Sequence, residues 1–403
     1  MSDPTVASAE AWFRDNWEAS ASLGEWWRRL AESGWGFPNW PKGAFGQGLD
    51  AGQARQVVAA RNRFGAYAPP TGIATMMVAR MLLACANDAQ KALWLRAIAE
   101  GRDNWCQLFS EPGAGSDLAG VRTRADATDG GYRINGQKVW TSGAHYADWG
   151  ILLARTDFSA PKHKGLSYFV IDMRQAGVDV RPLRQMNGAA EFNEVFLTDA
   201  FVPATNLIGA LGAGWSIALQ TLGFERDWLE IEGSGMMLAL DLNAPAGDYA
   251  SGAKSDGRER LAVPTGETAR DLVLQGLRAS PLRDDPHIRQ RAARLLAKIE
   301  TSQHVEAAGG AAGASIGKLA VSAISRDLAL LAHDLIGEDA LFDGAAASPL
   351  SLKLQSLLIS TPAVSIAGGT DEIQRNIIAE RVLGLPFEPR VDKDGPFDAL
   401  ARG

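Results

Sequence analysis

The chain has 403 residues, of which 46% are apolar and 22% charged, and its formal net charge is −7. This is the composition of a folded globular protein, and the length allows about two to four folding units. The acidic balance argues against a general nucleic-acid partner, because phosphate binding requires a basic surface. Two cysteines and five scattered histidines predict neither a disulfide framework nor a metal site.

The start of the chain carries no visible targeting signal. The sequence MSDPTVASAEAWF lacks a basic region followed by an apolar stretch, so no secretory signal is expected. No run of about 20 apolar residues occurs, so no membrane span is expected either. These observations predict a cytoplasmic protein.

The first hundred residues are mostly helical in pattern. The apolar stretch Thr75–Asn87 predicts a buried helix, and Gln90–Ala99 predicts another. From residue 104 to 211 the pattern becomes that of strands, because β-branched and aromatic residues are frequent and turn dipeptides separate several of the runs. The dipeptides are Asp129-Gly130, Asn135-Gly136 and Ala176-Gly177. The predicted strands are Asn104–Ser110, Tyr132–Asn135, Trp149–Arg155, Leu166–Asp172, Val178–Pro182 and Glu194–Leu197.

The helical pattern returns from residue 214 to about residue 385. Asp285 and Pro286 are typical of an N-cap and of the first helical position, whereas the polar stretch Ala244–Thr268 predicts a loop. Apolar residues at helical spacing are expected to face a core. They are Ile288, Leu295 and Ile299 in one helix, Ile316, Leu319, Ile324, Leu328, Leu331 and Leu335 in a second, and Ile373, Ile377 and Leu383 in a third.

These patterns predict an α+β multidomain chain. We expect an N-terminal helical domain at residues 1–103, a central β domain at residues 104–212 and a C-terminal helical domain at residues 213–403. The number and spacing of the short strands predict a small β-barrel or sandwich. A ligand site is expected where the three units meet.

A glycine-containing stretch follows the first predicted strand. It reads Gln107-Leu108-Phe109-Ser110-Glu111-Pro112-Gly113-Ala114-Gly115-Ser116-Asp117. Glycines let backbone N–H groups approach an anion or a flat ring, and Ser116 can donate a hydrogen bond. The stretch is neither a GxGxxG motif nor a P-loop, and an ordinary loop is an equally good interpretation of the pattern alone.

A second stretch, residues 136–143, reads GQKVWTSG. Trp140 followed by Thr141 and Ser142 at a strand end can stack on a ring and hydrogen-bond to it. A tryptophan buried in the core is the alternative, and it is the commoner situation.

The helix that begins at Gly214 carries a carboxylate among apolar residues. Glu225 lies three residues after Leu222 and four before Leu229, so it shares their face of the helix. Apolar surroundings raise the pKa of a carboxylate, which suits a general base near neutral pH. The alternative is a buried ion pair between Glu225 and an arginine. The whole stripe comprises Trp215, Leu219, Leu222, Leu229 and Met236, with Glu232 as a competing carboxylate.

The fourth stretch, Ile366–Asn376, reads IAGGTDEIQRN. Its two glycines followed by Thr370 predict a loop that enters a helix, with Thr370 as the N-cap. Such a helix start offers free N–H groups to a phosphate or a carbonyl. Simple capping is the alternative interpretation.

Together the four stretches resemble the acyl-CoA dehydrogenase family of flavoproteins. The resemblance extends over nearly the whole chain and keeps the family order of SEPGAGSD, GQKVWTSG, the Glu-Arg helix and GGTDEIQRN. The phrases WCQLFSEPGAGSDLAG, HKGLSYFVIDM and FNEVFL are most similar to the bacterial branch that acts on steroid side-chain or other bulky acyl-CoA thioesters. The family fold implies an N-terminal helical bundle, a central β-barrel or sandwich and a C-terminal four-helix bundle.

The resemblance implies non-covalently held FAD. Ser110 and Ser142 match hydrogen-bond partners of the isoalloxazine ring, and Trp140 matches a residue that lies against it. Thr370 and Glu372 match positions that contact the ribityl and diphosphate part. The implied cofactor-binding residues are Gln107, Leu108, Phe109, Ser110, Gly115, Ser116, Trp140, Thr141, Ser142, Thr370 and Glu372. The implied substrate-binding residues are Ser116, Gly223, Phe224, Arg226 and Gly369.

The resemblance also bears on the catalytic base. Many family members carry it as the Glu of a Tyr-Glu-Gly-Thr motif, a position that Gly368 occupies here. Other members place it on a helix just before an arginine, which here points to Glu225 and Arg226. The implied reaction is removal of the α-proton by Glu225, with hydride transfer from the β-carbon to flavin N5 and formation of a trans-2-enoyl-CoA.

Two motifs that complete the FAD site of a neighbouring subunit in many relatives are missing. Gly276–Arg283 and Leu341–Ser348 stand where Arg-x-x-Phe-Gly and Gly-Gly-x-Gly-Tyr are expected. The implied partners are an acyl-CoA substrate, an electron-transferring flavoprotein, and further subunits in a homotetramer or an α2β2 heterotetramer. An acyl-CoA oxidase or flavin monooxygenase of the same fold, or a partner subunit that completes another chain's site, are the alternatives.

Overall fold

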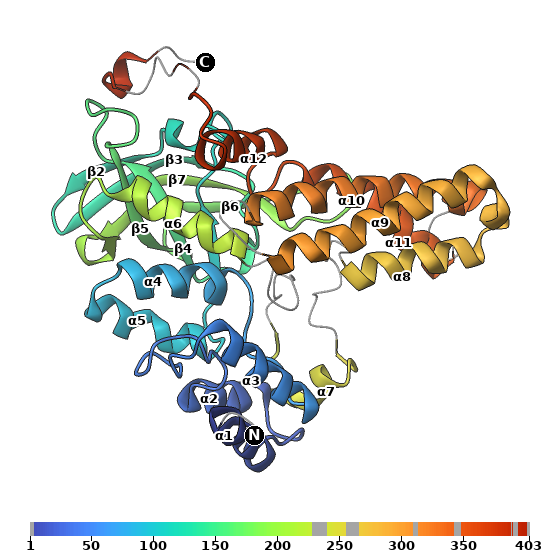
Figure 1. Cartoon of the computed structure of the whole chain (residues 1–403). Coiled ribbons are helices and arrows are strands. Elements are labelled where there is room, and N and C mark those ends of the chain that lie inside the picture. Colours follow the sequence, from blue (N-terminus) through green and yellow to red (C-terminus); the bar gives the residue numbers. More distant parts are fainter. Residues whose placement is uncertain are drawn as a thin grey trace.

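The computed structural model describes residues 4–227, 240–254, 266–308, 313–341, 348–387, 389 and 394–400, with the backbone alone at 225–227, 306–308 and 340. Within these residues the chain forms an N-terminal group of helices, a central β-sheet and a C-terminal group of helices (Figure 1). The predicted fold class is therefore confirmed. None of the described helices combines the length and apolar character that a membrane span requires.

The N-terminal unit packs around buried tryptophans. Trp26 and Trp27 on one helix donate their indole N–H groups to the carbonyls of Tyr67 and Ala68. The predicted helix Thr75–Asn87 begins instead as a π-helical turn at Ala74–Val78 and ends at Cys85, because Asn87 caps the next helix in a capping box. The helices are α1 (Pro4–Asn16), α2 (Leu23–Ser33), α3 (Ala51–Arg63), α4 (Ala79–Cys85) and α5 (Asp88–Ala99).

The central unit is one eight-stranded sheet with the order β6-β7-β3-β2-β4-β5-β8, in which β1 pairs in parallel with β4. The strands are β1 (Trp105–Leu108), β2 (Arg124–Thr128), β3 (Gly131–Lys138), β4 (Trp149–Arg155), β5 (Leu166–Asp172), β6 (Val178–Leu183), β7 (Phe192–Pro203) and β8 (Leu207–Ile208). The sheet curls over itself, because Tyr132 on β3 contacts Phe169 on β5 with ring centroids 5.0 Å apart although these strands are not neighbours. This curvature encloses a core of its own.

Three details of the strand predictions are wrong. Asn135-Gly136 is not a turn: it lies within β3, where the register shifts at a bulge and Gly136 has φ +159°. The sequence also missed β2 and β8, and β7 extends well beyond the predicted Glu194–Leu197. β2 reads RADAT and buries one side chain, so it offers neither the alternation nor the β-branched content that identifies a strand.

Four helices of the C-terminal unit form a bundle that projects away from the sheet (Figure 1). They are α8 (Gly266–Ala279), α9 (Pro286–Ala308), α10 (Gly313–Ile336) and α11 (Pro349–Val364), and they share one buried cluster. Asp285 caps α9 as predicted, accepting hydrogen bonds from the N–H groups of His287 and Ile288. Ile316 and Leu383 are exposed, contrary to expectation.

The remaining helices are α6 (Gly214–Asp227), α7 (Ala246–Ala250) and α12 (Asp371–Ile377), which continues as a π-helical turn at Ile378–Val382. The predicted loop Ala244–Thr268 therefore contains α7 and the start of α8, and its residues 255–265 lie outside the described part.

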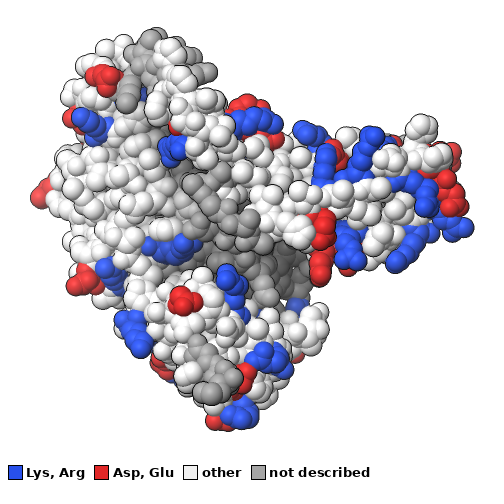
Figure 2. Space-filling view, viewed as in Figure 1, with Lys and Arg blue, Asp and Glu red and all other residues white. Residues whose placement is uncertain are grey.

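Figure 2 shows acidic and basic side chains gathered on the projecting bundle, where Arg291 pairs with Asp334 and Lys298 with Asp327.

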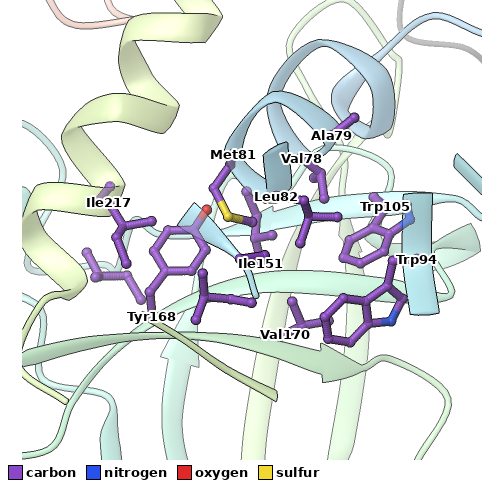
Figure 3. Packing of buried hydrophobic residues seen from close by; sticks show 14 of the residues in the cluster. Val78, Ala79, Met81, Leu82, Trp94, Trp105, Ile151, Tyr168, Val170 and Ile217 are labelled. Carbon is purple, nitrogen blue, oxygen red and sulfur yellow. The ribbon is translucent and has the colours of Figure 1, made fainter. Parts of the chain in front are cut away.

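The three units share one hydrophobic core (Figure 3). Met81 and Leu82 of α4 lie over the sheet residues Ile151 and Tyr168, and Ile217 of α6 approaches from the side. Burial of such side chains stabilises by roughly 1.5–3 kcal/mol each. The shared core fixes α4, α6 and the carboxyl end of β1 relative to one another. The first motif follows β1, and the third motif lies on α6.

Candidate functional site

The first two motifs meet at the ends of β1 and β3. The N–H of Val139 donates to the carbonyl of Ser110 over 2.9 Å. Below this contact the fully buried Lys138 places Nζ 2.9 Å from the carbonyl of Phe109, 2.8 Å from that of Leu153 and 2.9 Å from Glu111 Oε1. One ammonium group thus joins the two motifs, because all three of its protons have acceptors.

Glu111 completes this junction. Its carboxylate accepts hydrogen bonds from the N–H groups of Arg122 and Thr123 over 2.7 and 2.9 Å. Burial alone would raise the pKa of Glu111, but the Lys138 ammonium and the N–H donors outweigh burial and lower that pKa. The carboxylate is therefore ionised at neutral pH and holds both ends of the loop at residues 111–123.

The tip of that loop is open. Gly113, Gly115 and Ser116 are exposed, and a Cβ added at either glycine would meet no atom within 4 Å. Backbone groups at the tip are accordingly accessible to a ligand. The structure thus makes this stretch a loop, with firm attachments at its two ends and free space at its tip.

Trp140 is not a core residue. Its side chain is 61% exposed, and its backbone has φ +60°, a conformation that L-residues other than Asn and Asp rarely adopt. The ring contacts Phe192 edge to face, with centroids 6.0 Å apart. The interpretation as a buried core tryptophan is therefore wrong. A strained backbone that presents a large exposed ring indicates a functional position.

Thr141, the next residue, is fully buried, in contrast to the exposed Trp140. Its backbone pairs with that of Asn193 in both directions at 3.0 Å, and its buried Oγ1 has no hydrogen-bond partner among the described residues. Ser142 is half-buried, and it lines a cavity of about 40 Å³ between the 70–74 and 101–105 segments. The exposed Trp140 ring, two residues before the half-buried Ser142, fits a flat ring with polar edges, the kind of group that FAD presents.

The fourth motif is a capped helix start. Thr370 accepts from the N–H of Ile373 over 3.2 Å, as predicted, and the preceding Gly368 and Gly369 have φ +64° and +85°. Asp371 is buried against α10, where Lys318 Nζ lies 2.8 Å from Oδ1. Glu372 is exposed beside Arg375 at 3.6 Å. The hydrogen bonds described for this motif run to α10 and within its own loop, and do not reach the first two motifs.

The third motif lies partly outside the described residues. Glu225 and Arg226 are on α6, but nothing is described of their side chains, nor of Leu229, Glu232 and Met236. Gly223 and Phe224 are half-buried, and the Arg80 guanidinium lies 4.4 Å from the Phe224 ring centroid. Among the described side chains of α6, Ile217, Ala218 and Thr221 are buried, whereas Leu219 is 38% exposed. The predicted apolar stripe is therefore wrong at Leu219.

Sequence reasoning missed four buried cations that hold these motifs: Lys138, Arg155, Lys162 and Lys318. Arg155 ends the apolar strand β4, and its guanidinium donates to the carbonyls of Ala119, Val121 and Lys162. Burial, and next the charge of Arg122, lower the pKa of Arg155 to about 10, so it stays charged at neutral pH. A charge at the end of a run such as WGILLAR is the signal that could have identified Arg155.

A second, larger and open hollow of about 480 Å³ lies between α9 and α10, and none of the residues that line it was predicted as a site residue.

Known proteins resemble this chain along most of its length. Three family models match it: the N-terminal domain of acyl-CoA dehydrogenase at residues 4–102, its middle domain at 106–200 and its C-terminal domain at 267–383. Acyl-CoA dehydrogenase IpdE1 of Mycobacterium tuberculosis is 35% identical over 93% of this chain and 90% of its own length. IpdE1 of Mycolicibacterium smegmatis is 34% identical over 92% of this chain and 90% of its own.

Solved structures agree in fold. The "Tcur3481-Tcur3483 steroid ACAD G363A variant" aligns with a TM-score of 0.70 and 24% identity, covering 96% of this chain and 98% of its own. The ChsE4-ChsE5 complex from Mycobacterium tuberculosis aligns with a TM-score of 0.66 and 24% identity, covering 96% and 97%. At this identity the likeness establishes the arrangement of the three units.

Proposed function

Because the chain belongs to the acyl-CoA dehydrogenase family, we propose that it oxidises an acyl-CoA thioester to the trans-2-enoyl-CoA with FAD as cofactor. The observation that carries the proposal is Trp140, whose ring is 61% exposed on a backbone with φ +60°. It directly follows Val139, which is hydrogen-bonded to Ser110 at the start of the open loop. An exposed aromatic face beside an accessible glycine loop supports the binding of a flat ring such as a flavin.

In this proposal two loops and one helix start hold the cofactor. Trp140 would lie against the ring, and Ser110, Thr141 and Ser142 would offer hydrogen bonds to its polar edge. Gln107 and Leu108 at the end of β1, and Phe109 just after it, would lie beneath the ring, and Gly115 and Ser116 would close the site from the loop tip. Thr370 and Glu372 serve the ribityl and diphosphate part, where a helix N-terminus favours negative charge.

Glu225 is the proposed base. It follows Phe224 on α6, a helix packed into the core shared by all three units, and Gly368 has no side chain to compete for the proton. The substrate carbonyl is proposed to accept a backbone hydrogen bond near Gly369, which lowers the cost of enolate-like charge while Glu225 takes the α-proton. Bound FAD supplies the acceptor for the hydride that leaves the β-carbon.

The proposed acyl group is bulky. A glycine at position 368, where many relatives carry glutamate, leaves space near the reacting carbons for branched or ring-bearing chains. Gly223, Phe224, Arg226 and Ser116 are the proposed substrate contacts. One of the similar solved structures is a steroid ACAD, and this likeness supports testing steroid side-chain thioesters first.

Two kinds of partner complete the proposal. Turnover requires an electron acceptor, for which we propose an electron-transferring flavoprotein. The two motifs missing from Gly276–Arg283 and Leu341–Ser348 favour a second subunit that completes the adenosine end of the FAD site, either in a homotetramer or in an α2β2 heterotetramer. One of the similar solved structures is a complex of two proteins, ChsE4 and ChsE5, which supports the heteromeric form.

The proposal is tested by anaerobic bleaching of the flavin absorbance with short, branched, long and steroid acyl-CoAs. We expect bleaching with a bulky thioester, its loss in Glu225→Gln, and full bleaching in the control Glu267→Gln, which changes an exposed carboxylate on α8 in the same way. Full activity of Glu225→Gln would refute the base assignment.

The same preparation separates the alternatives. Peroxide formation in air, without any added acceptor, would instead indicate an acyl-CoA oxidase or flavin monooxygenase. FAD that binds only after co-expression with a second chain would indicate a subunit of a heteromer. Absence of flavin and of bleaching under both conditions would refute the proposed function.

A further inference from the structure

The C-terminal segment folds back on the β unit. Residues Pro396–Leu400 lie beyond residues 267–383, which the C-terminal family model matches, and Figure 1 places this red segment over the sheet. Pro396 forms a bridge with Pro161, the N–H of Phe397 donates to the carbonyl of Ala160 over 3.1 Å, and that of Asp398 to Phe158 over 3.0 Å. The segment thus adds a short strap to the connection between β4 and β5.

One side chain of the strap is almost completely buried. Phe397 is 2% exposed, and its ring centroid lies 3.5 Å from the guanidinium carbon of Arg155 and 4.9 Å from that of Arg122. Phe158 contacts the same ring with centroids 5.9 Å apart. Cation–π attraction is strongest for a desolvated cation, and Arg155 is 1% exposed. Phe397 therefore covers Arg155 and fixes the plane of its guanidinium.

Arg155 connects Phe397 to the open loop through hydrogen bonds. Its guanidinium donates to the carbonyls of Ala119 and Val121 over 2.7 and 3.1 Å, and to that of Lys162 over 3.0 Å. Lys162 in turn places Nζ 2.6 Å from Asp117 Oδ2. A continuous set of contacts thus leads from Phe397 to Asp117, next to Ser116 at the exposed tip.

We propose that the strap, through Phe397, is a positioning element for the Gly115–Asp117 turn and thereby for acyl-CoA binding. The inference rests on the proposed function, in which Ser116 lines the acyl-CoA site. Phe397 is 2% exposed and is not one of the proposed cofactor or substrate contacts: it acts through Arg155 and Lys162. Without the ring, water reaches the guanidinium, and Arg155 holds Ala119 and Val121 less firmly.

The test compares Phe397→Ala with Asp398→Ala. Asp398 is exposed and anchors the strap through its backbone, so its side chain is a matched control. A turn displaced by about 1 Å can cost about a hundredfold; for partial release we expect about a tenfold rise in KM for acyl-CoA in Phe397→Ala, with kcat within about twofold. Asp398→Ala should behave as the wild type. Phe397→Leu, which keeps apolar volume without the ring, should retain the melting temperature and show part of the rise.

A second measurement is independent of the reaction. Arg122 and Arg124 flank the far end of the loop, and trypsin should cleave there several times faster in Phe397→Ala than in Asp398→Ala. An unchanged KM together with unchanged cleavage would overturn the strap proposal. Faster cleavage in a protein that no acyl-CoA bleaches would instead refute the proposed function and leave the link between strap and loop intact.

Discussion

The buried ammonium of Lys138 provides the sharpest test of how the two motifs are held together. Replacing it with methionine, Lys138→Met, keeps the apolar volume but removes donors to the carbonyls of Phe109 and Leu153 and to the Glu111 carboxylate. Lys138 is fully buried, and the Glu111 side chain is 10% exposed. The variant therefore leaves a carboxylate in an enclosed position without its counter-ion.

Breaking a buried ion pair by removing one partner costs about 3–5 kcal/mol. For a cooperative unit of about 150–250 residues, each kcal/mol lowers the melting temperature by about 2–4 °C, so Lys138→Met should melt about 10 °C below the wild type. Lys138→Met combined with Glu111→Gln should recover part of the loss, because no charge remains buried.

The sign of the pH dependence follows from the pKa of Glu111. Burial alone would raise this pKa, but Lys138 together with the hydrogen bonds from Thr123 and Arg122 lowers it below its ordinary value of 4.5. A lowered pKa in the folded state contributes stability above the unfolded pKa, and this stability is lost as pH falls through the folded pKa. The difference between wild type and Lys138→Met should therefore be full near pH 7 and should shrink below about pH 4.5.

Differential scanning calorimetry from about pH 3.5 to about pH 8 measures these differences. The matched control is Lys164→Met, which changes an exposed lysine in the connection between β4 and β5. If Lys138→Met melts within about 2 °C of this control at pH 7, the buried pair contributes little, and the junction would have to be held by the Val139–Ser110 hydrogen bond and by packing.

Two further predictions concern the proposed flavin site. Trp140→Gly relieves a φ of +60° at a cost of one exposed ring, so the melting temperature of the flavin-free protein should stay within about 4 °C of the wild type. Flavin titration should nevertheless show binding weakened by about tenfold or more, in keeping with about 1–3 kcal/mol for a lost stacking contact. Asp371→Asn weakens the pair with Lys318 that holds the start of α12. Burial alone would raise the pKa of Asp371, but the hydrogen bonds from Lys318, Ser322 and Ser365 and the charge of Lys318 together outweigh burial and lower that pKa. The wild-type protein should therefore lose flavin as pH falls through this pKa. Asp371→Asn should bind flavin more weakly at neutral pH and show a flatter pH profile, whereas identical profiles would contradict the positioning role of Asp371.

The sequence predicted strands most accurately where nearly all of their side chains are buried. β4 and β5 were predicted with their observed bounds, because both strands are apolar on nearly every residue and end at turn signals. β2 was missed because it buries a single side chain and is defined mainly by its pairing with β3. The bulge at Gly136 was mistaken for a turn, because glycine after asparagine signals both, and only the partner strand β7 distinguishes them.

In the candidate site, the motif residues were predicted but the buried cations that hold them were not. Motif residues were identified as residue types, but the buried cations behind them were not, because an isolated lysine or arginine in a sequence is most often on the surface. Lys138 and Arg155 are buried only because carbonyls from distant segments converge on them. Such convergence depends on tertiary structure, so local sequence patterns could not predict it.

Trp140 is the converse case, because its side chain is exposed where the sequence favoured burial. Its sequence context allowed either a core ring or a ligand platform, and composition favours the core for tryptophan. Its neighbours on both sides are held by backbone hydrogen bonds, Val139 to Ser110 and Thr141 to Asn193, and the residue between them has a positive φ and an exposed ring. These contacts join segments that are distant in the sequence, so the local pattern could not predict them. Such backbone strain is typical of functional positions, which supports the proposed role of the Trp140 ring in flavin binding.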